Sequence, residues 1–354
     1  MITPSAAAVR LRALASERIL LTDGAFGTMI QSYGLSEADY RGDYELTDDQ
    51  KGNNDLLCLT RPDIIDAITR GYLDAGSDIV STNTFNANTI SQDDYKAVHL
   101  VRDINLGAAR IARKAADDYE AKDGRPRFVA GAIGPTNKTL SLSPDVNDPG
   151  FRAVEFDAMK AVYADQAVAL LDGGCDFILV ETIFDTLNAK AAIIAVLELA
   201  EQRGHEIPLM ISMTITDMSG RNLSGHSVDA FWYTVRHSKP LTIGLNCAFG
   251  ADLLRPYVQT LNPLADTLVM VYPNAGLPND LGEYDEQPHT TGAFIAEWVA
   301  EGLINVVGGC CGTTPEHIAS MARAVKGKPP RVIPRPKPVL RLAGLDPMIM
   351  ADAA

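Results

Sequence analysis

The chain has 354 residues and a formal net charge of −14, from 45 acidic and 31 basic side chains. Such a negative field repels phosphate backbones, so we expect no nucleic-acid partner. No apolar run approaches the roughly eighteen residues of a membrane-spanning helix, so we expect no membrane partner either. Five cysteines are too sparse for a disulfide scaffold, which favours a reducing, cytoplasmic location.

The chain begins with an amphipathic pattern over residues 1–18, which predicts a short N-terminal helix. Short apolar runs then alternate with helical stretches, a pattern typical of βα units with parallel strands. The predicted strands are Ile19–Thr22, Asp78–Thr82, Phe128–Ile133, Phe177–Glu181, Leu209–Thr214, Leu241–Asn246, Thr267–Val271 and Ile304–Val307. The clearest predicted helices are Pro62–Ala75, Val98–Asp118, Phe151–Asp172 and Thr186–Arg203.

Eight such units predict an α/β fold, a (β/α)8 TIM barrel, over residues 19–325. A doubly wound open sheet is the alternative, but no G-x-G-x-x-G follows the first strand. Residues 31–60 are polar and fall outside the repeat, so we expect a loop over the top of the barrel. Residues 326–354 are rich in Pro, Lys and Arg and predict an extended tail or linker, frayed from Asp346 onward.

Three cysteines stand where predicted strands end. Cys247 ends the sixth strand, and Cys310 and Cys311 follow the eighth among glycines. Both strands are even-numbered, so their inward side chains share a layer and the thiols should converge at the active-site end of a barrel. Three thiolates with an open fourth position suit a catalytic zinc ion, while a vicinal disulfide or simple core packing are the alternatives. We expect Cys58 and Cys175 to be core residues.

Two carboxylates also stand at strand ends. Asp23 ends the first strand and Glu181 ends the fourth. A carboxylate there is costly to desolvate and needs a cationic partner, for which a ligand ammonium group is a candidate. The loop amides after Asp23 could cradle a ligand carboxylate. The alternatives are a turn residue for Asp23 and a structural ion pair for Glu181.

Asparagines follow two further strands. Asn83, Asn86 and Asn88 follow the second predicted strand, and Asn274 follows the seventh. Asparagine tolerates left-handed turns, so shaping a loop and contacting a ligand are equally supported for these residues.

These residues together match a known family. The matching stretches are Thr22–Thr28, Asn54–Pro62, Thr82–Tyr95, Gly134–Asn137, Ser143–Pro149, Glu181–Lys190, Gly244–Gly250, Pro273–Pro278 and Gly308–Pro315. They span residues from about 20 to 345, nearly the whole chain. With them the chain resembles the homocysteine-binding module of cobalamin-dependent methionine synthase, within the wider homocysteine S-methyltransferase family.

The resemblance implies a metal centre. It implies a (β/α)8 barrel that binds Zn²⁺ through Cys247, Cys310 and Cys311. It also implies that Asn274 occupies the fourth zinc position when substrate is absent.

The resemblance also implies a substrate site. Homocysteine would place its amino group near Asp23 and Glu181. Its carboxylate would lie near the backbone amides of Gly24, Ala25 and Phe26.

The function implied is zinc-dependent methyl transfer to the sulfur of homocysteine, giving methionine. Methylcobalamin would come from another module or chain, since no D-x-H-x-x-G motif occurs here, and cobalamin- and folate-binding modules are the expected partners. We expect either a split subunit or an excised domain. The alternatives are a stand-alone homocysteine S-methyltransferase using S-methylmethionine, S-adenosylmethionine or betaine, and a structural zinc scaffold without turnover.

Overall fold

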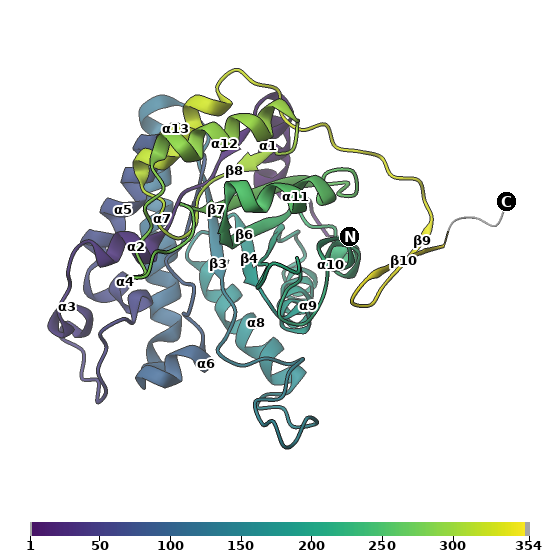
Figure 1. Ribbon diagram of the computed structural model, residues 1–354. Helices are drawn as coiled ribbons and strands as arrows, with labels where there is room; N and C mark the ends of the chain where they lie inside the picture. Colours follow the sequence, from purple (N-terminus) through teal and green to yellow (C-terminus); the bar gives the residue numbers. More distant parts are fainter. Residues whose placement is uncertain (1, 351–354) are drawn as a thin grey trace.

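The central element is a ring of parallel strands. The computed structural model describes residues 2–350. Its main sheet has the strand order β1-β8-β7-β6-β5-β4-β3-β2, and helices surround it (Figure 1). The strands are β1 (Leu20–Leu21), β2 (Ile79–Ser81), β3 (Phe128–Ile133), β4 (Phe177–Ile183), β5 (Leu209–Met213), β6 (Thr242–Gly250), β7 (Leu268–Asn274) and β8 (Val306–Val307). The fold is a nearly closed α/β barrel of the (β/α)8 TIM type, as predicted.

The helices fall into a surrounding layer and several short segments in the loops. The longer helices are α1 (Ala6–Glu17), α5 (Pro62–Ala75), α7 (Val101–Asp123), α8 (Phe156–Asp172), α9 (Thr186–Arg203), α10 (Val228–Val235), α11 (Ala251–Leu261), α12 (Pro288–Ala300) and α13 (Pro315–Val325). The short ones are α2 (Phe26–Gln31), α3 (Glu37–Arg41), α4 (Leu57–Thr60) and α6 (Thr89–Gln92).

The eight predicted strands are all present, and α5 and α9 have their predicted bounds. The differences lie at element ends. Helix α8 begins at Phe156 rather than Phe151, and α7 extends beyond Asp118 to Asp123. Strands β6 and β7 continue past their apolar runs to Gly250 and Asn274, because Asn246 pairs with Tyr272 and Gly250 pairs with Asn274.

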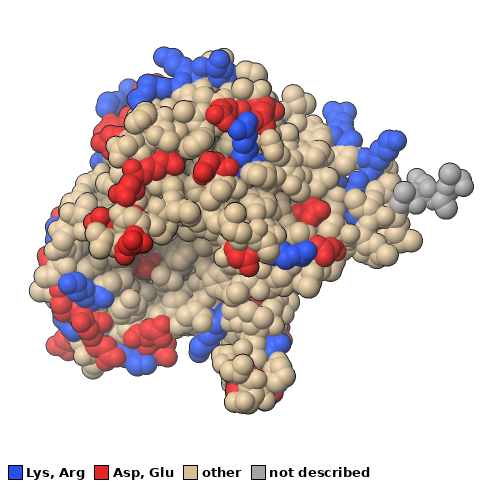
Figure 2. All heavy atoms as spheres, in the orientation of Figure 1, with Lys and Arg blue, Asp and Glu red and all other residues tan. Residues whose placement is uncertain are grey.

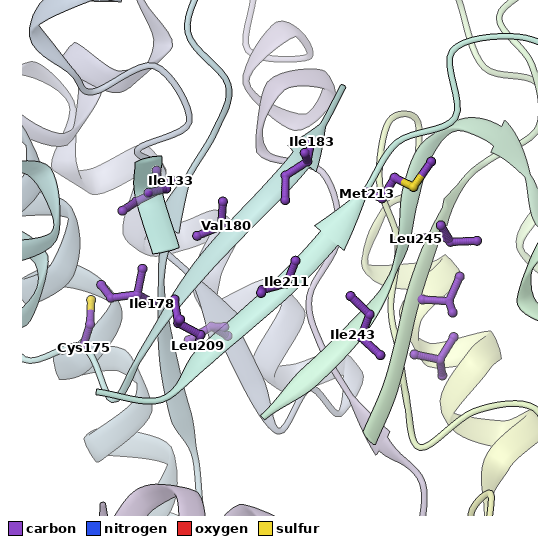
Figure 3. Close-up of a cluster of buried hydrophobic side chains, with 14 of the residues drawn as sticks. Ile133, Cys175, Ile178, Val180, Ile183, Leu209, Ile211, Met213, Ile243 and Leu245 are labelled. Atoms are coloured by element: carbon purple, nitrogen blue, oxygen red, sulfur yellow. The ribbon is translucent and has the colours of Figure 1, made fainter. Parts of the chain in front are cut away.

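Side chains alternate between two cores along each strand. On β4, Phe177 and Leu179 point into the barrel, whereas Ile178 and Val180 pack outward against the helices. Figure 3 shows this outer layer on neighbouring strands, from Ile133 on β3 to Leu245 on β6. The alternation leaves Glu181 on the inward face at the carboxyl end of its strand.

Helix α1 closes the amino end of the barrel. Its buried residues Ala8, Leu11 and Ala15 cluster with residues at the amino ends of the strands, including Leu20 and Phe177. The helix is capped by Ser5, whose side chain accepts the Ala8 N–H. The barrel is thus sealed at one end and can open only at the other.

Strands β1 and β2 are not paired with each other in the sheet, and a buried carboxylate links them instead. The Leu21 N–H donates to Asp78 Oδ2 at 3.0 Å, and the Asp78 N–H donates to the Leu21 carbonyl at 2.8 Å. The guanidinium of Arg18 neutralises Asp78 through two hydrogen bonds of 2.8 Å each. The side chain of Asp78 is fully buried, so this pair fixes the start of β2 against β1.

Two expectations outside the barrel repeat need correction. Residues 31–60 are not a plain loop, because they contain α3 and α4. The prediction of a tail frayed from Asp346 is wrong for 347–350, because β9 (Leu340–Ala343) and β10 (Pro347–Met350) form an antiparallel hairpin. The hairpin lies beside α10, where the Ser227 N–H donates to the Leu345 carbonyl at 3.0 Å. Residues 351–354 of the predicted tail lie outside the described residues.

The tail is anchored before it reaches the hairpin. Arg331 is 3% exposed and donates to the carbonyls of Thr267 and Ala265 at 3.0 and 2.7 Å. Its own carbonyl accepts from Asn305 Nδ2 at 2.8 Å. The extended stretch after α13 is therefore held against the β7–β8 side of the barrel.

We predict that Leu11→Ala lowers the free energy of unfolding by about 2–4 kcal/mol, because it opens a cavity in the sealed end of the barrel. Leu11 is fully buried, whereas Val9 on the same helix is 59% exposed. Val9→Ala is therefore the control and should change stability by less than about 0.5 kcal/mol. Urea denaturation measures both, and equal effects would show that α1 does not seal the barrel.

Candidate active site

A cavity of about 260 Å³ opens at the carboxyl ends of the strands. Figure 2 shows this face of the molecule hollowed, with acidic side chains around and within the hollow. The cavity is lined by Thr22, Asp23, Gly24, Ala25, Phe26, Gly27, Thr28, Asn54, Asp55, Ser81, Thr82, Asn83, Thr84, Phe85, Asn86, Leu179, Glu181, Thr182, Cys247, Met270, Tyr272, Gly309, Cys310 and Cys311. These lining residues include three carboxyl groups and no lysine, arginine or histidine.

The three predicted thiols meet at one side of this cavity. The sulfur atoms of Cys247, Cys310 and Cys311 all lie within 4.8 Å of one another. Those of Cys247 and Cys311 are 3.7 Å apart, and all three cysteines are free. The predicted convergence of the two cysteine segments is confirmed. Hydrogen bonds from the two neighbouring thiols lower the pKa of Cys311, whereas hydrogen bonds to the same neighbours raise the pKa of Cys310. The cluster therefore favours a single thiolate, at Cys311.

Unusual backbone conformations aim the thiols. Cys247 and Ala248 have φ angles of +59° and +61°, a left-handed conformation that costs energy for any residue with a Cβ. They lie where the register of β6 against β7 shifts, between Asn246 and Gly250. Immediately after β8, a Cβ added at Gly308 would lie 2.2 Å from the Thr22 methyl group, so only glycine fits. Local strain and close backbone packing therefore position the cluster.

The vicinal cysteines are fixed through their backbone. The Cys310 N–H donates to the Pro273 carbonyl at 2.8 Å, and the Cys311 carbonyl accepts the Ala275 N–H at 2.9 Å. The hydroxyl of Thr313 donates to the Cys310 carbonyl at 2.6 Å. These bonds join the loop after β8 to β7, so both thiols face the cavity from one rigid segment.

Asp23 is buried in the cavity wall without a cationic partner among the described residues. Its Oδ2 accepts hydrogen bonds from the Ser81 N–H at 2.6 Å and the Ser81 hydroxyl at 2.8 Å. Its Oδ1 accepts from the Thr22 hydroxyl at 3.1 Å. Burial nevertheless raises the pKa of Asp23 to about 6. The carboxylate both joins β1 to β2 and presents negative charge to the cavity.

Glu181 continues the inward face of β4 and lies beside the thiols. Desolvation raises the pKa of Glu181 to about 7, and the charges of Asp23 and Cys311 add to this effect. The hydroxyl of Tyr272 donates to Glu181 Oε2 at 3.1 Å and partly offsets it. A cation placed between Asp23 and Glu181 would remove the cost of ionising both groups.

The amides after Asp23 lie at the start of α2. The Ala25 N–H donates to the Thr313 hydroxyl at 3.3 Å, and Ala25 is the N-cap of the helix without a side-chain cap. The amides of Gly24 and Phe26 donate to no side chain among the described residues. They are therefore available to an anionic group in the cavity.

Asn274 has a different position from the other predicted residues. It ends β7, is 2% exposed and is not among the residues lining the cavity. Its Oδ1 is buried without a hydrogen-bond partner among the described residues. A buried, unpaired carbonyl oxygen is costly unless it accepts a hydrogen bond or coordinates a cation.

The sequence predictions omitted several residues of the site. Asn246 and Tyr272 could have been found by extending the inward alternation along β6 and β7. Asn246 Nδ2 lies 3.9 Å from Cys310 Sγ, and Asn246 Oδ1 accepts the Thr182 N–H at 3.1 Å. Asp55 could not have been found in this way, because it lies in the irregular segment after β1, where no strand alternation exists. Cys58 is 3% exposed and Cys175 is 8% exposed, and neither lines the cavity, as expected for core residues.

Comparison with known proteins identifies the class of protein. Residues 20–325 match the model of the homocysteine S-methyltransferase family. The chain therefore belongs to this family of methyltransferases, as the sequence resemblance indicated. None of the helices described between residues 2 and 350 is long and apolar enough to cross a membrane.

Solved structures of similar fold include two forms of the homocysteine methyltransferase MmuM from Escherichia coli. The oxidised form has a TM-score of 0.70 and 22% sequence identity, with 88% of this chain and 98% of that chain covered. The metallated form has a TM-score of 0.69 at 22% identity, with the same coverage of each chain. At this identity the likeness supports the barrel fold.

We predict that Glu181→Gln stabilises the ligand-free, metal-free protein by about 1–3 kcal/mol at pH 8, because it removes a desolvated charge. The gain should vanish below about pH 4.5, where the carboxyl is protonated in both folded and unfolded chains. It should grow as the pH rises from about 4.5 to about 7, where only the unfolded chain ionises the group, and level off above about 7, the pKa in the folded protein.

Thermal unfolding between pH 4 and 8 measures this difference. Glu283→Gln is the matched control, because Glu283 is exposed in the loop before α12. A gain that does not depend on pH, or that Glu283→Gln reproduces, would contradict the account of Glu181.

Proposed function

We propose that this protein activates the thiol of homocysteine for methyl transfer, giving methionine, with Zn²⁺ bound by Cys247, Cys310 and Cys311. The observation that carries the proposal is the convergence of three thiols on a cavity that also holds Glu181 and Asp23. Together these groups suit a small ligand that has both a thiol and an ammonium group. The proposal includes a cytoplasmic location.

The donor set fits zinc. Three thiols within 4.8 Å of one another supply soft ligands from two rigid strand ends, and a fourth position facing the cavity is left for substrate. The unpaired Oδ1 of Asn274 supports its role as an oxygen ligand when substrate is absent. When bound, zinc ionises the substrate thiol, which at its usual pKa of about 8.5 is only a few per cent thiolate at pH 7.

The remaining groups orient the substrate. The ammonium group of homocysteine would pair with Asp23 and Glu181, and its charge would offset the desolvation that raises the pKa of both carboxyl groups. The substrate carboxylate would accept hydrogen bonds from the amides of Gly24 and Phe26. Binding at both ends holds the sulfur on the thiol side of the cavity, so that its attack on the methyl group becomes effectively intramolecular.

The reaction transfers a methyl group between two partners. The thiol proton passes to solvent when the substrate binds, and the sulfur lone pair forms the new carbon–sulfur bond. The bond between the methyl group and the donor breaks, and its electron pair stays with the donor. Leu179 and Met270 are apolar parts of the cavity wall and exclude water there, which strengthens the electrostatic interactions of the reacting groups.

We propose methylcobalamin as the donor, carried by another module or subunit, with a folate-binding module to remethylate it. The support is the likeness of the Asn54–Pro62 and Thr82–Tyr95 stretches to the cobalamin-dependent branch of the family. Both stretches contribute residues to the cavity wall, which a donor must approach to reach the substrate sulfur.

A second candidate is a stand-alone methyltransferase that uses a sulfonium donor. It is favoured by the likeness to MmuM, of whose chain 98% is covered. Turnover of the isolated protein with S-methylmethionine but not with methylcobalamin would decide for this candidate.

We predict that Cys310→Ser abolishes both zinc binding and methionine formation from homocysteine and methylcobalamin, because two thiolates hold zinc far less tightly than three. Cys175→Ser is the control, since Cys175 is a buried thiol outside the cavity, and it should retain both properties. Metal analysis and product formation measure the effect. Retention of zinc and turnover in Cys310→Ser would overturn the proposal.

A further inference from the structure

One wall of the cavity has no role in the chemistry described so far. The strand order places β2 four positions from β6 around the ring, so the loop that follows β2 faces Cys247 across the barrel. Asn86 lines the cavity from this loop, and Asn54 and Asp55 line it from the segment that is hydrogen-bonded to Asn86. The cavity therefore has a thiol side and an opposite polar wall.

The carboxyl group of Asp55 is the unusual feature of this wall. Asp55 is 4% exposed, and its Oδ1 accepts the Asn86 N–H at 2.9 Å. Its Oδ2 has no hydrogen-bond partner among the described residues, and no basic side chain lines the cavity. A carboxyl group this deeply buried with one oxygen left without a donor is costly, which points to a donor supplied by a ligand in the cavity that Asp55 lines.

The position of Asp55 is fixed by a buried network rather than by a loose loop. Asn53 and Gln92 exchange two side-chain hydrogen bonds of 2.9 Å each, and both residues are buried. Gln92 Nε2 also donates to the Asn86 carbonyl at 3.2 Å. These bonds connect Asn53 to Asn86, the residue whose N–H binds Asp55, so the polar wall is preorganised.

Homocysteine does not satisfy Asp55 in the proposed binding mode. Its single ammonium group is placed between Asp23 and Glu181, and the charges of Asp23 and Cys311 act directly on Glu181. Neither Asp23 nor Glu181 is among the groups that perturb Asp55. Asp55 is therefore left for a second molecule in the cavity.

We propose that Asp55 forms a donor subsite, in which its Oδ2 accepts a hydrogen bond from an N–H group of the methyl donor. This inference rests on the proposed function, in which the second molecule is that donor. Methylcobalamin carries primary amide N–H groups around its ring, and S-methylmethionine carries an ammonium group. Both present the same chemistry to a carboxylate, and Asp55 would hold the methyl group between itself and the thiols.

The test compares Asp55→Asn with wild type in separate assays with methylcobalamin and with S-methylmethionine. Asparagine keeps the shape and the acceptor for the Asn86 N–H but replaces the free acceptor with an N–H donor. We expect the KM for whichever donor is used to rise at least tenfold, while the KM for homocysteine and the zinc content stay unchanged. Asp43→Asn is the matched control, because Asp43 is exposed in the same segment and outside the cavity.

Two results would overturn the subsite. The first is a donor KM for Asp55→Asn within twofold of that for Asp43→Asn. The second is a change in the KM for homocysteine as large as the change in the KM for the donor, or a loss of zinc, or a loss of folded structure measured by circular dichroism. Any of these would mean that Asp55 only maintains the structure of the wall.

Failure of the proposed function would look different. It would appear as absence of turnover by the wild type with both donors. Equilibrium dialysis of each donor against zinc-loaded wild type and Asp55→Asn then tests the subsite without turnover. Weaker retention by Asp55→Asn supports the subsite, and equal retention or no retention by the wild type contradicts it.

Discussion

The convergence of three sulfur atoms within 4.8 Å is the constraint on which the rest of the site depends. It requires the segments that follow Leu245 on β6 and Val307 on β8, two residues that both pair with Val271 of β7, to meet at the carboxyl end of the barrel. A Cβ at Gly244 would lie 1.5 Å from the Met270 carbonyl oxygen, so β6 and β7 can approach only because that residue is glycine. The left-handed backbone at Cys247 then turns the thiol toward the pair after β8.

The acidity of the cavity follows from the same arrangement. Asp23, Asp55 and Glu181 are placed among thiols with no basic side chain on the cavity wall, and burial raises the pKa of each carboxyl. In the absence of ligands such a site lowers the stability of the protein. This loss of stability is explained if the cavity binds a metal ion and two molecules that are cationic or carry N–H groups.

The sequence predicted the barrel because apolar β-rich runs and helical stretches alternate from one end of the chain to the other. It also predicted that Cys247 meets Cys310 and Cys311, because the sixth and eighth strands are both even-numbered and the inward side chains of such strands share a layer of the barrel. It could not predict Asp55 or the hairpin β9–β10. Those positions depend on tertiary contacts, such as the Asn53–Gln92 pair and the hydrogen bond from Ser227, that leave no periodic pattern in the chain.

The most direct test of the central claim is X-ray absorption at the zinc edge, recorded with and without homocysteine. The account predicts three sulfur ligands and one oxygen or nitrogen ligand in the absence of homocysteine, and replacement of that lighter ligand by a fourth sulfur when homocysteine is added. A ligand set that homocysteine does not change would contradict the account. It would favour a closed, structural zinc site in place of thiol activation.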